Sequence, residues 1–138
     1  MSATLGERFA QALAAKDRDA LCALLGPEID FRALTPGRAW EAATPAETVD
    51  DIILGRWFDP DNHIERLVQV TTARMSDREH LSYRLQVRTG TTHYLVEQQA
   101  YYATAGDRIT WLRILCSGYR PCEKADQVQG VPDTNPTR

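Results

Sequence analysis

The sequence predicts an α+β fold in which a curved antiparallel β-sheet is covered by three N-terminal helices. Apolar residues recur at helical spacing in several stretches up to about residue 57, and from residue 64 they alternate with polar residues instead. Two long strands are predicted near the end of this pattern, Thr92–Ala103 and Arg108–Tyr119, joined by a turn that contains Gly106. We expect the upstream segments to curve and cover the sheet that these two strands anchor.

The composition fits one globular domain. The chain has 138 residues, of which 43% are hydrophobic and 25% charged, so it is long enough to bury its own core. From Lys124 the sequence loses periodicity and offers little to bury. We therefore expect residues 1–120 to form a single domain and residues 121–138 to form a flexible C-terminal tail.

Charge and motif content argue against several partners. A formal net charge of −3 gives no basic footprint for nucleic acid, and no apolar run is long enough to span a membrane. The N-terminal sequence does not have the order of a signal peptide, so a cytoplasmic location is expected. The three cysteines follow no metal-ligand spacing and no glycine-rich phosphate loop is present, so we predict no cofactor and no metal.

Two helices are predicted first. Thr4 and Glu7 form a capping-box pattern ahead of apolar residues at helical spacing, which predicts a helix to about Ala15. Asp17 is placed to cap a short second helix, and Gly26 with the following proline is expected to end it.

A hairpin and a third helix follow. Segments 29–33 and 38–41 alternate around a Thr-Pro-Gly turn at 35–37, which predicts a small hairpin. Thr44-Pro45-Ala46-Glu47 combines a cap, a proline at the first helical position and an acid at the third. Apolar residues at steps of three or four extend this helix to Trp57, and the polar stretch at 59–62 ends it.

The pairing of the later strands can be predicted from their turns. A two-residue turn at Gly90-Thr91 places Arg84 opposite Glu97 and Tyr83 opposite Gln98. A turn at Ala105-Gly106 places Gln98 beside Arg113. One face of the sheet would then hold Tyr83, Gln98 and Arg113, with Trp111 and Tyr94.

The opposite face is predicted to be apolar as well, since Leu95, Leu112, Ile114 and Cys116 would project from it. A sheet face open to water normally carries polar residues. We therefore expect a second subunit to cover this outer face and form a homodimer.

The order of helix, helix, hairpin, helix and four long antiparallel strands resembles the nuclear-transport-factor-2-like superfamily. These cone-shaped α+β barrels, also called cystatin-like, include ketosteroid isomerases, scytalone dehydratase and SnoaL-like polyketide cyclases. The resemblance covers roughly residues 4 to 120, and it is carried by residues 9–13, 44–47 and 106–113. It implies a pocket between the curved sheet and the helices, often used for a hydrophobic small molecule, and frequent dimerisation.

The catalytic residues of three relatives do not transfer to this chain. Ketosteroid isomerases resemble it but place a carboxylate base in the first hairpin, where this chain reads Phe31-Arg32-Ala33-Leu34-Thr35. SnoaL-like cyclases tend to carry an aspartate near the end of the last strand, where Ser117 stands here. Limonene epoxide hydrolases need an aspartate–arginine–aspartate cluster, and the predicted layer holds Arg113 without an aspartate.

Candidate catalytic residues are His63, Arg113 and Tyr83. Arg113 would anchor an anion or carbonyl, unless it pairs with a neighbouring acid or faces solvent. Tyr83 and Gln98 would orient a ligand oxygen, although a hydrogen bond between the two is equally natural. His63 is the candidate base because its unperturbed pKa lies near neutrality. Other residues have weaker cases as bases: His93, Asp30 and Glu41.

Ligand-binding candidates are residues that the pattern places near the predicted pocket: Gln98, Trp57, Trp111, Tyr94, Trp40 and Ser117. The tryptophans at 40 and 57 would pack the pocket wall or the core, and an aromatic residue at helical spacing is more often part of the core than a ligand platform. Asp61, Asn62 and His63 could imitate metal ligands, but a solvated loop is the better interpretation.

Three functions remain open. The first is a SnoaL-like protein whose apolar pocket binds a small hydrophobic oxygen-bearing molecule and isomerises, cyclises or dehydrates it. The second is a ligand-binding or dimerisation module without turnover. Nucleic-acid or protein transport is a third, which the net charge disfavours.

Overall fold

The computed structural model describes residues 3–122, so residues 123–138 of the predicted C-terminal tail lie outside the described residues. Three helical segments and seven strands follow one another in the order α1 (Leu5–Ala14), α2 (Arg18–Leu24), β1 (Leu25–Thr35), β2 (Arg38–Ala42), η1 (Glu47–Trp57), β3 (Asn62–Met75), β4 (Arg78–Thr89), β5 (Thr92–Ala105), β6 (Arg108–Cys116) and β7 (Arg120–Pro121). None of the helices in the described part of the chain is long and apolar enough to cross a membrane.

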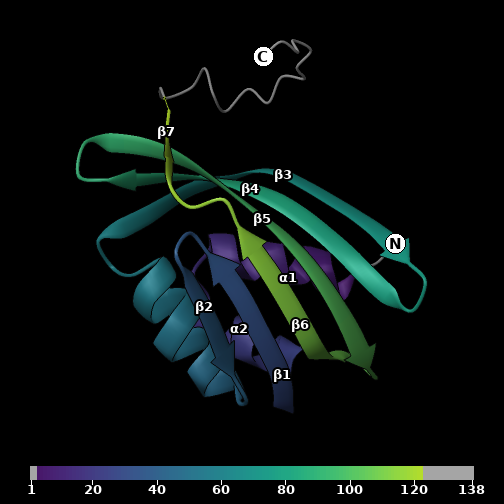
Figure 1. The fold of residues 1–138 in the computed structure, drawn as a ribbon. Helices are drawn as coiled ribbons and strands as arrows, with labels where there is room; N and C mark the ends of the chain where they lie inside the picture. The colour runs from purple at the N-terminus through teal and green to yellow at the C-terminus, as the bar shows by residue number, and fades with distance from the viewer. Residues whose placement is uncertain (1–2, 123–138) are drawn as a thin grey trace.

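The strands form one curved, open sheet in the order β2-β1-β6-β5-β4-β3, and the short β7 pairs with β5. All pairings are antiparallel except that of β1 with β6, which is parallel. Helices α1 and α2 cover one face of the sheet and η1 lies beside β2, whereas the other face is free of helices (Figure 1). We call the helix-covered face the inner face and the opposite one the outer face. The predicted α+β class is confirmed.

The helix starts follow the predicted signals. Thr4 and Glu7 make both hydrogen bonds of a capping box at α1, and Asp17 caps α2 by accepting from the Ala20 amide. The end of α2 differs from the prediction, because Gly26 and the following proline belong to β1 rather than to a helix terminus. Pairing of β1 with β6 is interrupted between Leu25 and Asp30, and this gap accommodates a proline that cannot donate a ladder hydrogen bond.

The third helix also starts as predicted but has a different internal geometry. Thr44 Oγ1 accepts from the Glu47 amide at 3.1 Å, while the Glu47 carboxylate accepts from the Ala43 amide at 3.0 Å. The segment η1 is a π-helix over all 11 of its residues. The wider turns bring the backbone close at Gly55, where an added Cβ would lie 2.2 Å from the Asp50 carbonyl oxygen.

The register predicted for β4 and β5 is confirmed, with Tyr83 opposite Gln98 and Arg84 opposite Glu97. The register predicted for β5 and β6 is wrong. Ala105 pairs with Arg108 at the turn, a shift that would by itself keep every side chain on its predicted face. A bulge then follows, because Thr104 pairs with Ile109 but Ala103 pairs with Trp111. The extra residue reverses the faces of all later residues in β6.

The space between helices and sheet is filled. Phe9, Leu13, Phe31, Tyr83, Leu85 and Val96 each have 0% exposure and belong to one continuous core. Leu112 and Ile114 are part of this core. The prediction that these two residues lie on the outer face is therefore wrong, and the bulge in β6 is the reason.

Candidate functional site

A small group of polar side chains lies inside the apolar core, on the inner face. Tyr83 on β4 donates a hydrogen bond to Gln98 Oε1 on β5, and both side chains have 0% exposure. Their positions follow from the confirmed pairing, which places them directly opposite each other. This contact is the hydrogen bond that sequence reasoning weighed against a ligand role. It fixes the amide oxygen of Gln98 and leaves its amide nitrogen for another acceptor.

Three further residues join this group. Cys116 on β6 lies opposite Gln98 in the register, and its thiol is close enough to the phenols of Tyr83 and Tyr119 to affect the pKa of each. The Tyr119 hydroxyl donates to the Trp57 carbonyl oxygen at 2.6 Å, which links the C-terminal end of β6 to η1. We define the inner polar cluster as Tyr83, Gln98, Cys116, Tyr119 and Trp57.

Two donors of the cluster have no acceptor. Gln98 Nε2 and Trp57 Nε1 are buried, and neither makes a hydrogen bond within residues 3–122. A buried donor without a partner costs about 1–3 kcal/mol, so nearly all such groups in folded proteins are satisfied. An acceptor from outside the chain would therefore be favourable beside each of these two donors.

The two phenols of the cluster are uncharged at ordinary pH. Burial raises the pKa of Tyr83 well above its usual value, with a smaller contribution from Cys116. Burial also raises the pKa of Tyr119, and the nearby Asp59 carboxylate adds to this effect. Both phenols therefore stay protonated. Both phenol O–H groups already donate within the protein, so the donors that the cluster offers to a ligand are the two free N–H groups.

Aromatic rings surround the cluster on the side of η1 and β2. Trp57 packs against Phe31 and Trp40 with ring centroids 6.1 Å away in both cases. Tyr119 packs against Tyr94 at 5.4 Å and against Phe58 at 6.1 Å. Trp40, Tyr94 and Tyr119 are only half-buried, so they form the less enclosed part of this wall. Predicted ligand-binding residues Gln98, Trp57, Tyr94 and Trp40 thus lie in or around one cluster.

The structure separates Arg113 and Trp111 from the other predicted site residues. Both lie on the outer face, where the Arg113 guanidinium is 4.3 Å from the Trp111 ring centroid. Arg113 Nη1 donates to the backbone and side-chain oxygens of Asp30 at 2.9 and 3.2 Å. The predicted layer of Tyr83, Gln98 and Arg113 is therefore wrong, because the bulge in β6 turns Arg113 outward. The sequence analysis also considered that Arg113 pairs with a neighbouring acid, and the contact with Asp30 agrees with that alternative.

Two other predicted residues lie away from the cluster's donors. His63 is exposed at the start of β3, opposite Arg88. Ser117 serves the backbone at the end of β6: its hydroxyl accepts from the Glu97 amide at 3.0 Å and donates to the Gly118 carbonyl at 2.8 Å. Within the described residues, no group of three or more His, Cys, Asp or Glu side chains is arranged to hold a metal ion.

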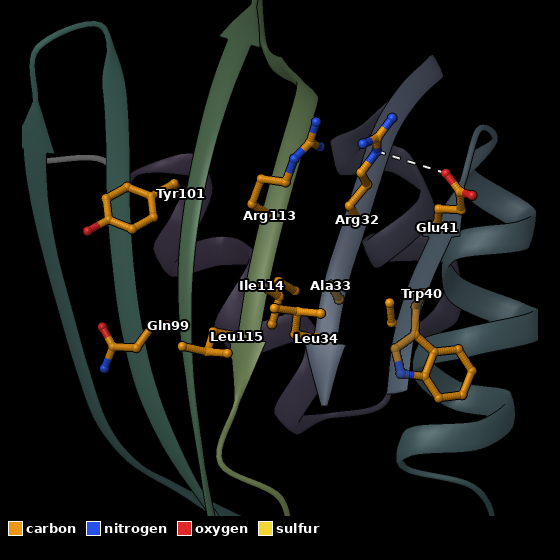
Figure 2. Close-up of a pocket in the computed structure, with 11 residues that line it drawn as sticks. Arg32, Ala33, Leu34, Trp40, Glu41, Gln99, Tyr101, Arg113, Ile114 and Leu115 are labelled. Carbon is orange, nitrogen blue, oxygen red and sulfur yellow. Dashed lines mark ion pairs between the residues drawn. The ribbon is translucent and has the colours of Figure 1, made fainter. Parts of the chain in front are cut away.

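A groove of about 720 Å³ lies on the outer face, across β2, β1, β6 and β5. Figure 2 shows Arg113 and Arg32 side by side at one end, with Leu115 and Leu34 beyond them. Arg32 Nε lies 3.9 Å from Glu41 Oε1, so each arginine has an acid beside it. We call this feature the outer groove; its lining residues are Arg32, Ala33, Leu34, Ala39, Trp40, Glu41, Gln99, Tyr101, Arg113, Ile114 and Leu115.

Sequence reasoning did not select Tyr119 or Cys116 for the cluster, or Arg32, Leu34 and Tyr101 for the outer groove. Tyr119 follows the last regular strand, so no alternation predicts its direction. Cys116 was placed on the wrong face by the predicted register. The groove residues become recognisable only when β1 is known to lie beside β6, which is a parallel contact between distant segments.

Comparison with known proteins rests on structure alone. No protein-family model matches the chain, and no curated protein matches it in sequence. A protein described as an isomerase from Bacillus subtilis superposes with a TM-score of 0.68 at 17% identity, covering 82% of this chain and 84% of that one. A LEH-like epoxide hydrolase from Mycobacterium tuberculosis gives 0.60 at 16% identity, covering 82% and 80%.

A third solved structure identifies the fold. A protein with a ketosteroid isomerase-like fold from Catenulispora acidiphila, solved with trimethylamine, gives a TM-score of 0.62 at 15% identity and covers 85% of this chain and 88% of its own. The chain has the nuclear-transport-factor-2-like fold. In this fold the inner polar cluster lies between the curved sheet and its helices. Since the identities are low, the similarity establishes the fold and not an activity.

Proposed function

We propose that this chain binds a small, largely apolar molecule whose carbonyl or hydroxyl oxygen accepts hydrogen bonds from Gln98 Nε2 and Trp57 Nε1. The observation that carries this proposal is the burial of both donors without an acceptor. The aromatic rings around them suit an apolar body, and one oxygen would relieve the cost of the unsatisfied donors. The ligand would reach them by displacing the half-buried rings of Trp40, Tyr94 and Tyr119.

Binding without turnover fits the cluster better than catalysis. Isomerisation, cyclisation or dehydration requires a group that takes a proton from the bound molecule. The phenols of Tyr83 and Tyr119 are held protonated by burial, and the Gln98 amide and Trp57 indole do not act as bases near neutral pH. Turnover is the second candidate, because enzymes are known with this fold. To test it, the ligand is incubated with the protein and then recovered, and a change in its mass would show turnover.

The experiment compares two probes that differ in one oxygen, 2-acetylnaphthalene and 2-ethylnaphthalene, by calorimetry. We expect the ketone to bind the wild-type protein about tenfold more tightly, since each neutral hydrogen bond contributes roughly 1 kcal/mol. Gln98→Met and Trp57→Phe should each remove much of this preference. Gln99→Met is the matched control, because Gln99 is the neighbouring residue on the outer face and bonds to Ser82 and Glu97 there. Equal affinity for both probes in the wild type would show that the free donors bind no oxygen.

We further propose that a second copy of the chain covers the outer groove. Three of the four large hydrophobic side chains that are exposed in residues 3–122 line it, namely Leu34 at 54%, Leu115 at 57% and Tyr101 at 36%. Contiguous exposed apolar surface of this kind marks an interaction site. Two arginine–acid pairs, Arg32 with Glu41 and Arg113 with Asp30, lie beside it, so a two-fold copy can place its acids against the arginines of this one.

Light scattering after gel filtration tests this proposal. The wild-type protein is expected at twice the chain mass, and Leu115→Glu or Leu34→Glu should raise the dimer dissociation constant at least tenfold, because each puts a charge into the buried contact. Met75→Glu is the matched control, since Met75 is 60% exposed but lies at the end of β3, away from the groove. A monomeric wild type, or dimers that withstand both leucine substitutions, would show that this face has another role.

A further inference from the structure

Two positive charges share one aromatic ring beside the inner polar cluster. The guanidinium carbon of Arg38 lies 3.7 Å from the Trp40 ring centroid, and that of Arg56 lies 5.5 Å from the same centroid. Arg38 begins β2 and Arg56 belongs to the last turn of η1, so two distant segments bring these cations together. Both arginines are exposed. Their cation–π contacts with Trp40 hold the charges in place at the surface.

Neither arginine pairs with a carboxylate among the described residues. The nearest acids along the chain are engaged elsewhere. Glu41, the acid nearest to Arg38, lies beside Arg32 on the neighbouring strand (Figure 2). Asp59, the acid nearest to Arg56, accepts from the Asn62 side chain at 2.9 Å. Two like charges near one ring repel each other, so an anion bound close to both would be favourable.

This pair of cations lies one ring away from a free donor of the cluster. Trp40 packs edge-on against Trp57 at 6.1 Å and 85°, and Trp57 Nε1 is one of the two donors without an acceptor. The Trp40 ring is fixed in turn, because its Nε1 donates to Thr35 Oγ1 at 2.8 Å. A molecule whose oxygen reaches the cluster therefore passes Trp40, and its outer end comes close to Arg38 and Arg56.

We infer that the ligand carries an anionic group at the end opposite to its oxygen, and that Arg38 and Arg56 bind this group. This inference rests on the proposed function and specifies its ligand class: an elongated apolar molecule with a ketone or hydroxyl at one end and a carboxylate or phosphate ester at the other. A guanidinium binds both anions through paired N–H donors. The apolar part would lie against Trp40 and Trp57.

The test uses one ketone in three forms: 5-oxo-5-phenylpentanoate, its uncharged methyl ester, and 4-oxo-4-phenylbutyl phosphate. Affinities are measured by calorimetry for the wild type, for Arg38→Gln/Arg56→Gln, and for Arg8→Gln as the control. Arg8 is an exposed arginine on α1 and has the same charge. We expect at least one anion to bind the wild type tenfold or more tightly than the ester, and this preference to decrease as salt is raised. The double variant should lose it and the control should keep it.

The possible outcomes separate the two proposals. An ester that binds as tightly as both anions would overturn the anion site and leave the oxygen site standing. An anion preference that persists in the double variant would show that other charges cause it. Failure of all three forms to bind would overturn both proposals. Because the double variant also loses contacts with Trp40, Arg38→Lys/Arg56→Lys is measured as well, and it should retain part of the preference.

Discussion

Gly55→Ala is expected to lower the free energy of unfolding by about 3 kcal/mol, because the new methyl group has no room in the π-helix. Its Cβ would lie 2.2 Å from the Asp50 carbonyl oxygen and 3.2 Å from the carbonyl carbon, and both atoms belong to the backbone. A backbone carbonyl group cannot relieve this clash by changing rotamer, as a side chain could. The helix would have to change its turn, which would shift Trp57 at its C-terminal end.

The sign of this change distinguishes two helix geometries. In an ordinary α-helix, Gly→Ala raises stability by about 1 kcal/mol, because alanine has the better helix propensity. Chemical denaturation measures the difference. Gly26→Ala serves as the control, since an added Cβ there lies 3.3 Å from a methyl group of Thr110 and should change stability much less. A stabilised Gly55→Ala protein would contradict the π geometry of η1.

Tyr83→Phe is expected to cost about 1–3 kcal/mol of folding stability, because it leaves Gln98 Oε1 buried without a donor. Gln98→Met alone should also be destabilising, since it removes the acceptor of the Tyr83 hydroxyl. The double variant removes both partners and the unsatisfied Gln98 Nε2 together, so its stability should return close to that of the wild type. The two single effects are thus strongly non-additive.

The neighbouring pair supplies the control for this cycle. Ser82 and Gln99 also lie opposite each other on β4 and β5, with Gln99 Nε2 donating to Ser82 Oγ at 3.0 Å, but on the half-buried outer side. Ser82→Ala and Gln99→Met should each change stability by about 0.5 kcal/mol or less, because water can replace the lost partner on this half-buried side, and their coupling should be correspondingly small. Additive effects of Tyr83→Phe and Gln98→Met would indicate that their hydrogen bond is not formed. A stable double variant that no longer prefers the ketone probe would also separate folding from binding.

The features that were predicted correctly from the sequence are those that depend on interactions between residues close together in the chain. The capping box of Thr4 and Glu7 and the cap at Asp17 involve neighbouring residues, and both form as the sequence predicts. The pairing of Tyr83 with Gln98 depends on a two-residue turn at Gly90, whose φ of +62° suits a glycine. One half of the candidate site was therefore within reach of pattern reasoning.

The face on which Arg113 lies could not be predicted from the sequence, because β6 is apolar on both faces. Trp111 and Leu115 lie on one face, and Leu112 and Ile114 on the other. Alternation cannot choose between two such faces. A bulge of one residue in the β5–β6 pairing makes the choice, and the neighbouring strand β1 supplies Asp30 as the partner of Arg113. Packing of the larger apolar set against the helices decides where that bulge is favourable.

The sequence by itself determined the order of the main elements, the starting points of the helices and the β4–β5 register, because each of these depends on residues close together in the chain. The tertiary structure alone decided the π turn of η1, the face taken by Arg113, and the meeting of Arg38 with Arg56 on Trp40. These features depend on contacts between segments far apart in sequence. The free energy of such contacts is set by how the whole core packs, which no local pattern records.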